Sequence, residues 1–259
     1  MEKLPARVGW EWLKEGFALF RKRPTELLTL FLSYMFLMFA VGIIPLFGQV
    51  LPMLLVPVFS MAFMHACLNV EQGKKVNPSL LLTGFRSPAF MRLLQLGMLY
   101  LLAAVIAIAA SALVDGGVFW KVMTGQSGMD ANTVRDSNMS MAMLFAAAAY
   151  TPAAMAFWYA APLIAWQDMG VGKAIFYSFF AVKRAGKAFL VYGLAWMLIG
   201  VFVPVLASSI VALLFGKAAI VMLILLPLSI VMTVVMYCSF YPTYTQLFGK
   251  PGQAVAKRD

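Results

Sequence analysis

A single histidine, His65, carries the side chain best suited to proton transfer near neutral pH. It lies within a long apolar stretch, whereas all ten Asp and Glu residues lie outside the apolar stretches or at their ends. Hydrolytic or metal-dependent catalysis needs a base, a nucleophile and a stabilising group, or several clustered ligands. The sequence therefore predicts a non-enzymatic protein with no catalytic residues, no metal site and no cofactor.

His65 itself has two interpretations. In the first it is a proton-sensitive element or a substrate contact in the middle of the second apolar stretch. In the second it is a neutral imidazole that hydrogen-bonds a neighbouring helix or a backbone carbonyl. Buried polar side chains commonly serve packing between membrane helices, and this favours the second interpretation.

Asp168 follows the fourth apolar stretch, and Lys173 comes shortly after it. This spacing predicts an interfacial ion pair between the two residues, with Lys183 and Arg184 as other candidate partners. The alternative is an ordinary interfacial carboxylate. It is favoured because exposed ion pairs contribute little to stability.

Three arginines, Arg21, Arg86 and Arg184, precede alternate apolar stretches at similar distances. They either bind the headgroups of anionic phospholipids at three related sites or only anchor the chain on the cytoplasmic side, and anchoring is favoured. The net charge is +10, but the basic residues sit in short segments between apolar stretches. This pattern excludes nucleic acid as a partner and indicates membrane lipids, anionic phospholipid above all, with a membrane-protein partner as a further candidate.

Membrane-spanning helices must position these residues. The chain is 63% hydrophobic and 12% charged, which is more apolar than a water-soluble core can hide. Its apolar stretches are continuous, which favours helices over the alternating strands of a barrel. Six of them approach the length of about 20 residues that a membrane helix needs. They are residues 27–47, 50–69, 93–114, 141–166, 189–213 and 219–246. Pro152 and Pro162 are expected to bend the fourth.

The fold class that follows is all-α: one integral domain built as a transmembrane bundle of six spans. It has an amphipathic leader at 1–26, a bundle at 27–246 with an outer loop at 115–140, and a tail at 247–259. All but three of the 20 Lys and Arg residues, namely Lys121, Arg135 and Lys217, fall on one side of these spans. The positive-inside rule therefore predicts a bacterial inner-membrane protein with both termini in the cytoplasm.

Short segments that end in a basic residue precede the first, third and fifth spans. They are residues 10–21 (WEWLKEGFALFR), 77–86 (NPSLLLTGFR) and 173–184 (KAIFYSFFAVKR). We interpret the chain as three copies of one unit, an interfacial helix followed by a hairpin of two spans. In the first segment Trp10, Leu13, Phe17 and Phe20 recur at helical spacing, which predicts a helix in the membrane plane. The third segment is more apolar and is expected to be covered by the others.

The two cysteines, Cys67 and Cys238, fall inside apolar stretches. We interpret them as small buried or lipid-facing residues, because such positions suit neither a disulfide pair nor a metal site.

Several motifs resemble a known family. They are residues 9–16 (GWEWLKEG), continuing through Phe20 and Arg21 to Pro24, residues 44–48 (IPLFG), and residues 73–86 from GKK to GFR. On these motifs the chain is similar to a family of uncharacterised proteobacterial inner-membrane proteins, found mainly in beta-proteobacteria. More distantly it is similar to the six-helix membrane domain beside some glycerophosphodiester phosphodiesterases, without a catalytic domain of that kind. The resemblance implies an integral inner-membrane protein and no catalytic residues.

Two functions therefore compete. The leading one is a non-enzymatic membrane protein that contacts lipid or partner proteins. The alternative is a transporter or channel for a neutral or amphipathic solute, with lipid among the candidates. A solute-sized polar cavity between spans would favour the alternative, and a lipid-filled groove would favour the first.

Overall fold

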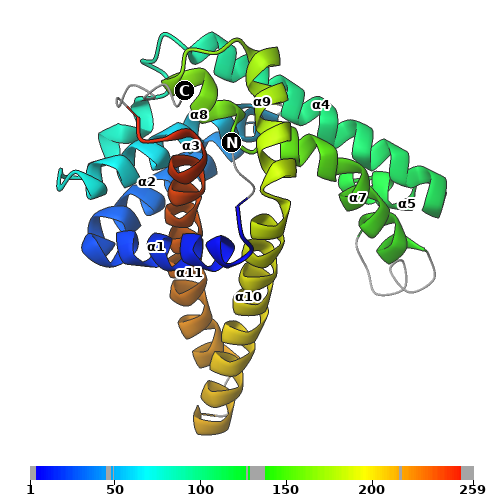
Figure 1. Cartoon of the computed structure of the whole chain (residues 1–259). Helices are drawn as coiled ribbons and strands as arrows, with labels where there is room; N and C mark the ends of the chain where they lie inside the picture. Colours follow the sequence, from blue (N-terminus) through cyan, green and yellow to red (C-terminus); the bar gives the residue numbers. More distant parts are fainter. Residues whose placement is uncertain are drawn as a thin grey trace.

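The computed structural model describes residues 4–44, 48, 50–126, 128, 138–215 and 218–251 (Figure 1). Most of the outer turns expected near 46–49 and 215–217, part of the outer loop at 115–140 and most of the tail at 247–259 lie outside these described residues. Helices account for most of what is described, as the fold class required. In chain order they are α1 (Arg7–Lys22), α2 (Pro24–Gly42), α3 (Val50–Glu71), the 3-10 helix η1 (Pro78–Leu82), α4 (Phe90–Asp115), α5 (Val118–Met123), α7 (Met139–Phe157), α8 (Ala160–Trp166), α9 (Val171–Arg184), α10 (Gly186–Phe215) and α11 (Ala218–Phe248).

The six predicted spans are confirmed as helices long and apolar enough to cross a membrane. They are α2, α3, α4, the pair α7 and α8, α10 and α11. Spans that follow one another in the chain pack together as α2 with α3, α4 with α7, and α10 with α11. A short helical segment precedes each hairpin, as predicted. The first and third of these segments, α1 and α9, are α-helices. The middle segment forms η1, because Pro78 opens it and the backbone bonds run from Leu80 to Asn77 and from Thr83 to Leu80.

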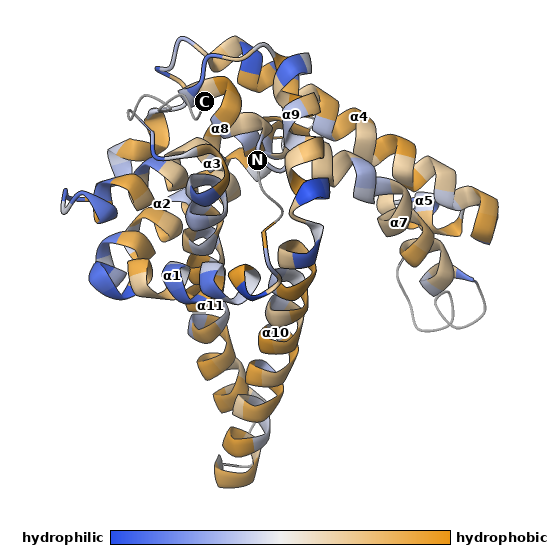
Figure 2. Cartoon of the chain, viewed as in Figure 1, coloured by the Kyte–Doolittle hydropathy of each residue, from blue (hydrophilic) through white to orange (hydrophobic). Residues whose placement is uncertain are grey.

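The helices meet in one region, which we call the hub, where α3 packs against α1, α8 and α11, and α1 packs against α11. The α4–α7 and α10–α11 hairpins leave this region in different directions (Figure 1). Figure 2 shows that the projecting hairpins are strongly apolar. In α3, 56% of the most apolar stretch is buried, against 6% in α10. The core therefore forms around α3, and the hairpins present most of their surface outward, as lipid-facing helices do.

The leader helix α1 lies across α10 and α11 near the ends that join the hub (Figure 1). It ends at Lys22, and Arg23 breaks it from α2 with a non-helical backbone, at φ −146° and ψ 62°. Two glycines allow close approach. A Cβ on Gly9 would lie 2.1 Å from the carbonyl oxygen of Ala188 in α10, and one on Gly16 would lie 2.3 Å from the Cα of Ser239 in α11. The backbones of α1 and its two partners are therefore in direct contact.

The aromatic stripe expected on α1 is divided between two environments. Leu13 and Phe20 are buried against the bundle, whereas Trp10 and Phe17 are each 47% exposed. The buried face centres on Trp12, which is 0% exposed. The prediction of a helix is confirmed. The neighbouring helices cover half of the aromatic stripe, and the position of this helix in the membrane plane stays a prediction.

The fourth span is interrupted at Trp158 and Tyr159, between α7 and α8. Pro162 explains the break, because proline has no N–H and its ring crowds the carbonyl four residues earlier, that of Trp158. The break separates the Tyr159 N–H from the Met155 carbonyl, which would bond to each other in a continuous helix, and Ser178 of α9 bonds to both. Its Oγ accepts a 2.9 Å hydrogen bond from the Tyr159 N–H and donates one of 2.9 Å to the Met155 carbonyl. At Pro162 the expected bend is thus a break in the helix, and the buried Ser178 side chain of α9 bridges it.

The α9 helix is not covered, contrary to the expectation. Its small residues Ala174, Ser178 and Ala181 are buried, and α9 packs against α7 and α8 through this side. Phe176 and Phe180 are 60% and 48% exposed. The covered face is the one with small side chains, because these let the helices approach closely. The large aromatic rings are left outside.

The two cysteines are both buried and free. Cys67 of α3 and Cys238 of α11 belong to the same buried cluster, and these two helices pack against each other. They therefore belong to the packed contact between these two helices.

Candidate functional site

His65 lies six residues before the end of α3, about 9 Å along the helix, and not in the middle of a span. Its Nδ1 is 2.8 Å from the Met61 carbonyl oxygen, and its Nε2 lies 3.2 Å from the indole nitrogen of Trp166 in α8. The indole N–H donates, so Nε2 must accept and Nδ1 must carry the proton that the carbonyl accepts. Both ring nitrogens of a neutral imidazole are therefore engaged, which matches the interpretation of His65 as a packing residue.

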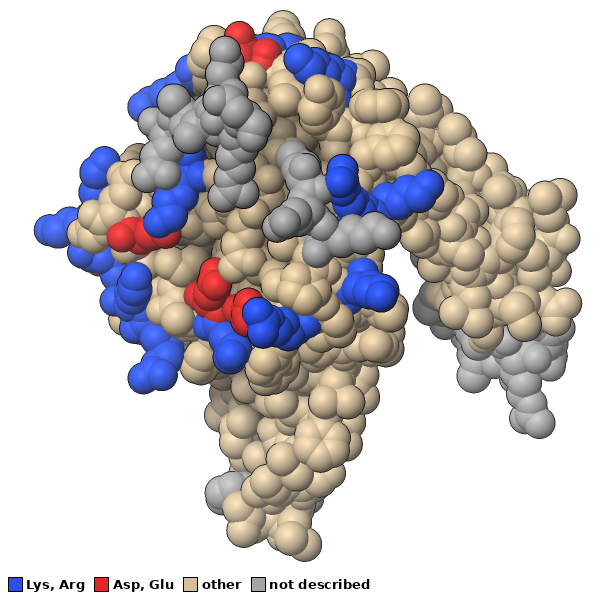
Figure 3. Space-filling model, in the orientation of Figure 1, with Lys and Arg blue, Asp and Glu red and all other residues tan. Residues whose placement is uncertain are grey.

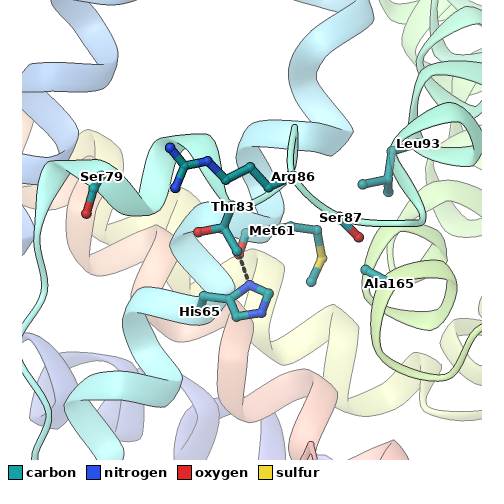
Figure 4. Close-up of a pocket in the computed structure, with 9 residues that line it drawn as sticks. Met61, His65, Ser79, Thr83, Arg86, Ser87, Leu93 and Ala165 are labelled. Atoms are coloured by element: carbon teal, nitrogen blue, oxygen red, sulfur yellow. Dashed lines mark hydrogen bonds between the residues drawn. The ribbon is translucent and has the colours of Figure 1, made fainter.

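A pocket of about 380 Å³ opens beside this imidazole (Figure 4). The α3 helix, the η1 turn, and parts of α4 and α8 enclose it. The residues that line it are Met61, His65, Ser79, Thr83, Gly84, Arg86, Ser87, Leu93 and Ala165. One part of the lining carries hydroxyls and a guanidinium, and another part is apolar. The structure thus brings together His65 and Arg86, which the sequence analysis treated separately.

The other two candidate arginines do not line this pocket. Arg21 lies near the end of α1 and Arg184 at the end of α9, and all three arginine side chains are exposed. On the face shown in Figure 3, Lys and Arg gather over the hub, whereas the projecting parts are almost entirely uncharged. The three arginines therefore lie on different elements and do not form one site.

The ion pair expected between Asp168 and Lys173 is replaced by another. The Asp168 carboxylate binds the guanidinium of Arg92, at the start of α4. The same guanidinium donates 3.2 Å hydrogen bonds to the carbonyls of Asp168 and Met169. Asp168 has a left-handed φ of 51°, and this turn presents all three acceptors to Arg92. The prediction of Lys173 as partner is wrong because Lys173 lies on α9 with its Nζ 5.8 Å from the Tyr177 ring centroid.

A polar network that the sequence analysis missed fastens α1 to α11. The Trp12 indole N–H donates a 2.9 Å hydrogen bond to Oε1 of Gln246, and the Gln246 amide donates one of 2.9 Å to Glu15. Burial raises the pKa of the Glu15 carboxyl above its ordinary 4.5, and the negative charge of Glu11 adds to the rise. A signal was present, because Gly9, Trp12 and Gly16 fall on one helical face.

A second network joins α3, α11 and the residues that follow α11. Tyr241 donates a 2.7 Å hydrogen bond to Oε2 of Glu71, whose Oε1 lies 2.8 Å from the Lys250 ammonium. Glu15, Lys22, Glu71 and Tyr241 line a smaller pocket of about 190 Å³ between these elements. Glu15 and Glu71 already have partners in neighbouring elements. We therefore assign these side chains to packing of the hub and not to ligand binding.

The exposed face of α9 combines aromatic rings with positive charge. The rings of Phe176 and Phe180 are tilted against each other, with their centroids 4.6 Å apart. Lys173, Lys183 and Arg184 are exposed on the same helix. Rings of this kind suit the headgroup region of a bilayer, and the basic side chains suit anionic lipid.

Among the described residues, no three His, Cys, Asp or Glu side chains are close enough together to hold a metal ion. What the hub offers is recognition of an anion by Arg86 and neighbouring hydroxyls, together with an aromatic and basic surface on α9.

Comparison with known proteins gives one detailed match. A probable inner membrane protein of the beta-proteobacterium Burkholderia thailandensis is 40% identical over 258 residues, covering 96% of this chain and 95% of the relative. No family model and no solved structure matches the chain.

Proposed function

This chain belongs to the same family as the probable inner membrane protein of Burkholderia thailandensis, and we propose that it is a non-enzymatic protein that binds anionic phospholipid on the cytoplasmic side. The family and the six apolar helices make it an integral protein of the inner membrane. The cytoplasmic location of both termini is part of the proposal and rests on the asymmetry of Lys and Arg. The distant similarity to the membrane domain beside glycerophosphodiester phosphodiesterases stays a prediction.

The observation that carries the proposal is the exposed face of α9. A helix whose large rings and basic residues both point away from the protein needs a partner that is apolar at one depth and anionic at another. The inner headgroup region of a bacterial membrane has both properties, and each basic side chain there gains about 1 kcal/mol. Phe176 and Phe180 would lie among the upper acyl carbons, with Lys183 and Arg184 at the phosphates.

The absence of catalysis is supported by how the described carboxylates are used. Asp168 is paired with Arg92, Glu71 with Lys250, and Glu26 with Arg23. Asp115 accepts hydrogen bonds from the backbone N–H groups of Gly117 and Phe119 at the start of α5. These acids have structural partners, which leaves them poorly placed to act as general bases.

Lipid retention in mild detergent tests the proposal. The double variant Lys183→Gln/Arg184→Gln should keep less phosphatidylglycerol than the wild type, measured by native mass spectrometry. Lys121→Gln on α5, within the outer loop at 115–140, is the matched control and should retain lipid normally. Equal retention by the double variant and the control would refute the proposal. So would a co-purified protein that is lost, with lipid retained, only in the double variant.

The transporter alternative draws support from the solute-sized pocket beside His65. It requires passage of a neutral or amphipathic solute across the bilayer. Flux measured in proteoliposomes, with Thr83→Val as the pocket variant, separates it from lipid binding alone. Solute or lipid flux that needs the protein and falls in Thr83→Val would favour the transporter.

A further inference from the structure

We propose that the pocket beside His65 binds a phosphodiester group, the one carried by the headgroup of a membrane phospholipid. The proposal rests on the proposed lipid-binding function, but it concerns a different surface from α9. It adds a defined site and a defined chemical group to what is otherwise a general affinity for anionic lipid.

Hydrogen-bond donors line one part of the pocket. The hydroxyls of Ser79, Thr83 and Ser87 lie along the η1 turn and the approach to α4, with the Arg86 guanidinium among them. In Figure 4 the Arg86 side chain extends over Thr83, and Thr83 lies between it and the His65 ring. Hydroxyls and a guanidinium are the side chains that bind phosphate oxygens most directly. Ser79 and Arg86 are exposed, so the donors can be reached from outside.

The charge of the pocket fits a monoanion. Arg86 is the charged residue in the lining, and among the described residues it takes part in no ion pair. His65 contributes no charge in this geometry, because Met61 and Trp166 engage its two nitrogens as those of a neutral ring. One positive charge balances the single negative charge of a phosphodiester. A phosphomonoester, with up to two negative charges, would leave charge uncompensated beside an apolar wall.

The remainder of the lining suits what a phospholipid carries next to its phosphate. Met61 and Leu93 are buried, and Ala165 adds a third apolar side chain from α8. A glycerol backbone and the first acyl carbons can lie against these side chains. Inorganic phosphate would leave this apolar surface in contact with water.

The frame of the pocket is held in place before any ligand binds. A Cβ on Gly84 would lie 2.6 Å from the carbonyl oxygen of Val58, so the turn is pressed directly onto α3. The Ser87 Oγ accepts a 3.1 Å hydrogen bond from the Ala89 N–H at the start of α4 and still has its own hydrogen to donate. The partial positive charge at the N-terminus of α4 adds to the field of Arg86. Donors that are already positioned lose little freedom on binding.

Binding of a soluble probe tests the proposal on the full chain in detergent. The probe is dihexanoyl-phosphatidylglycerol, titrated by calorimetry, with inorganic phosphate titrated separately. Arg86→Gln should weaken binding of the lipid probe about ten-fold or more, and Thr83→Val a few-fold. The matched controls are Lys121→Gln on α5 and Thr151→Val on α7, since neither residue lines the pocket. Both should bind as the wild type does.

Thr83→Val keeps the shape of the side chain, so it remains informative if Arg86→Gln lowers the melting temperature. The site is overturned if wild type binds no lipid probe, or if the pocket variants bind as well as their controls. The assignment to a phospholipid is overturned if inorganic phosphate binds as tightly as the lipid probe. Retention of phosphatidylglycerol through Lys183 and Arg184 is measured separately. Failure of the pocket site would therefore leave the proposed lipid binding by α9 untouched, and the reverse also holds.

Discussion

The indole nitrogen of Trp12 donates a 2.9 Å hydrogen bond to the side-chain oxygen of Gln246, 234 positions later in the chain. This contact joins the first helix to the last. The Gln246 amide also donates to Glu15, so one side chain of α11 holds two residues of α1. The leader is thereby an integral part of the hub.

Replacing Trp12 with Phe should lower the stability of the hub. Trp12 is 0% exposed, so the smaller phenyl ring leaves a void where Trp12 packs against α10, and the hydrogen bond to Gln246 is lost. A large-to-small change at a buried position of this kind costs about 0.5–3 kcal/mol. The melting temperature in detergent should fall, and limited proteolysis should cut near α1 sooner. Trp10→Phe is the control, because Trp10 is 47% exposed. Equal melting temperatures for the two variants would contradict the contact.

A methyl group at Gly16 should be poorly tolerated. It would lie 2.3 Å from the Cα of Ser239, so α1 and α11 would have to move apart. Overpacking of this kind costs about 1–3 kcal/mol. Gly172→Ala on α9 is the matched control, because nothing lies within 4 Å of its added Cβ. Thermal melts should rank Gly16→Ala well below Gly172→Ala, and the reverse order would mean that α1 does not pack closely on α11.

The raised pKa of Glu15 predicts a pH dependence of stability. Between pH 4.5 and the raised folded pKa, the folded protein keeps a proton on Glu15 that the unfolded chain has lost. Stability should therefore fall as the pH rises through this window and then level off. Glu15→Gln removes this titration. The melting temperature of the variant minus that of the wild type should therefore increase as the pH rises through this window. A difference that does not change with pH would contradict the raised pKa of this carboxyl.

Ser178→Ala should weaken the joint between α7, α8 and α9. The change leaves both the Tyr159 N–H and the Met155 carbonyl without the partner that Ser178 supplies, which costs about 1–3 kcal/mol for a buried group. Ser208→Ala is the control, because its exposed hydroxyl bonds only to Val205 in its own helix. The free energy of unfolding in detergent should fall for Ser178→Ala alone.

Reporter fusions test the orientation. A fusion at Gln72 and one after Asp259 should give cytoplasmic signals, and one at Gly128 should give an external signal. The reason is that only three basic residues fall on the outer side. A cytoplasmic signal at Gly128 would contradict the six-span arrangement.

The sequence favoured a packing role for His65 but gave no sign of its partner. Trp166 lies 101 positions away, and the pocket that unites His65 with Arg86 exists only because η1, α4 and α8 pack around the end of α3. The partner of Asp168 was missed for the same reason. Lys173 is near in the chain, but the turn at Asp168 presents its acceptors to Arg92, on a helix that starts 78 residues earlier.

The amino-acid sequence by itself determined that this is a six-span helical membrane protein. Span length depends on bilayer thickness, and helicity on the need to satisfy every backbone group locally, so both can be read from consecutive residues. Only the tertiary structure decided which faces are covered. Trp12 is buried and Trp10 is exposed although they lie two residues apart, because Gly9 and Gly16 place one face of α1 against α10 and α11. Burial depends on helices far away in the chain, which no local pattern of apolar residues specifies.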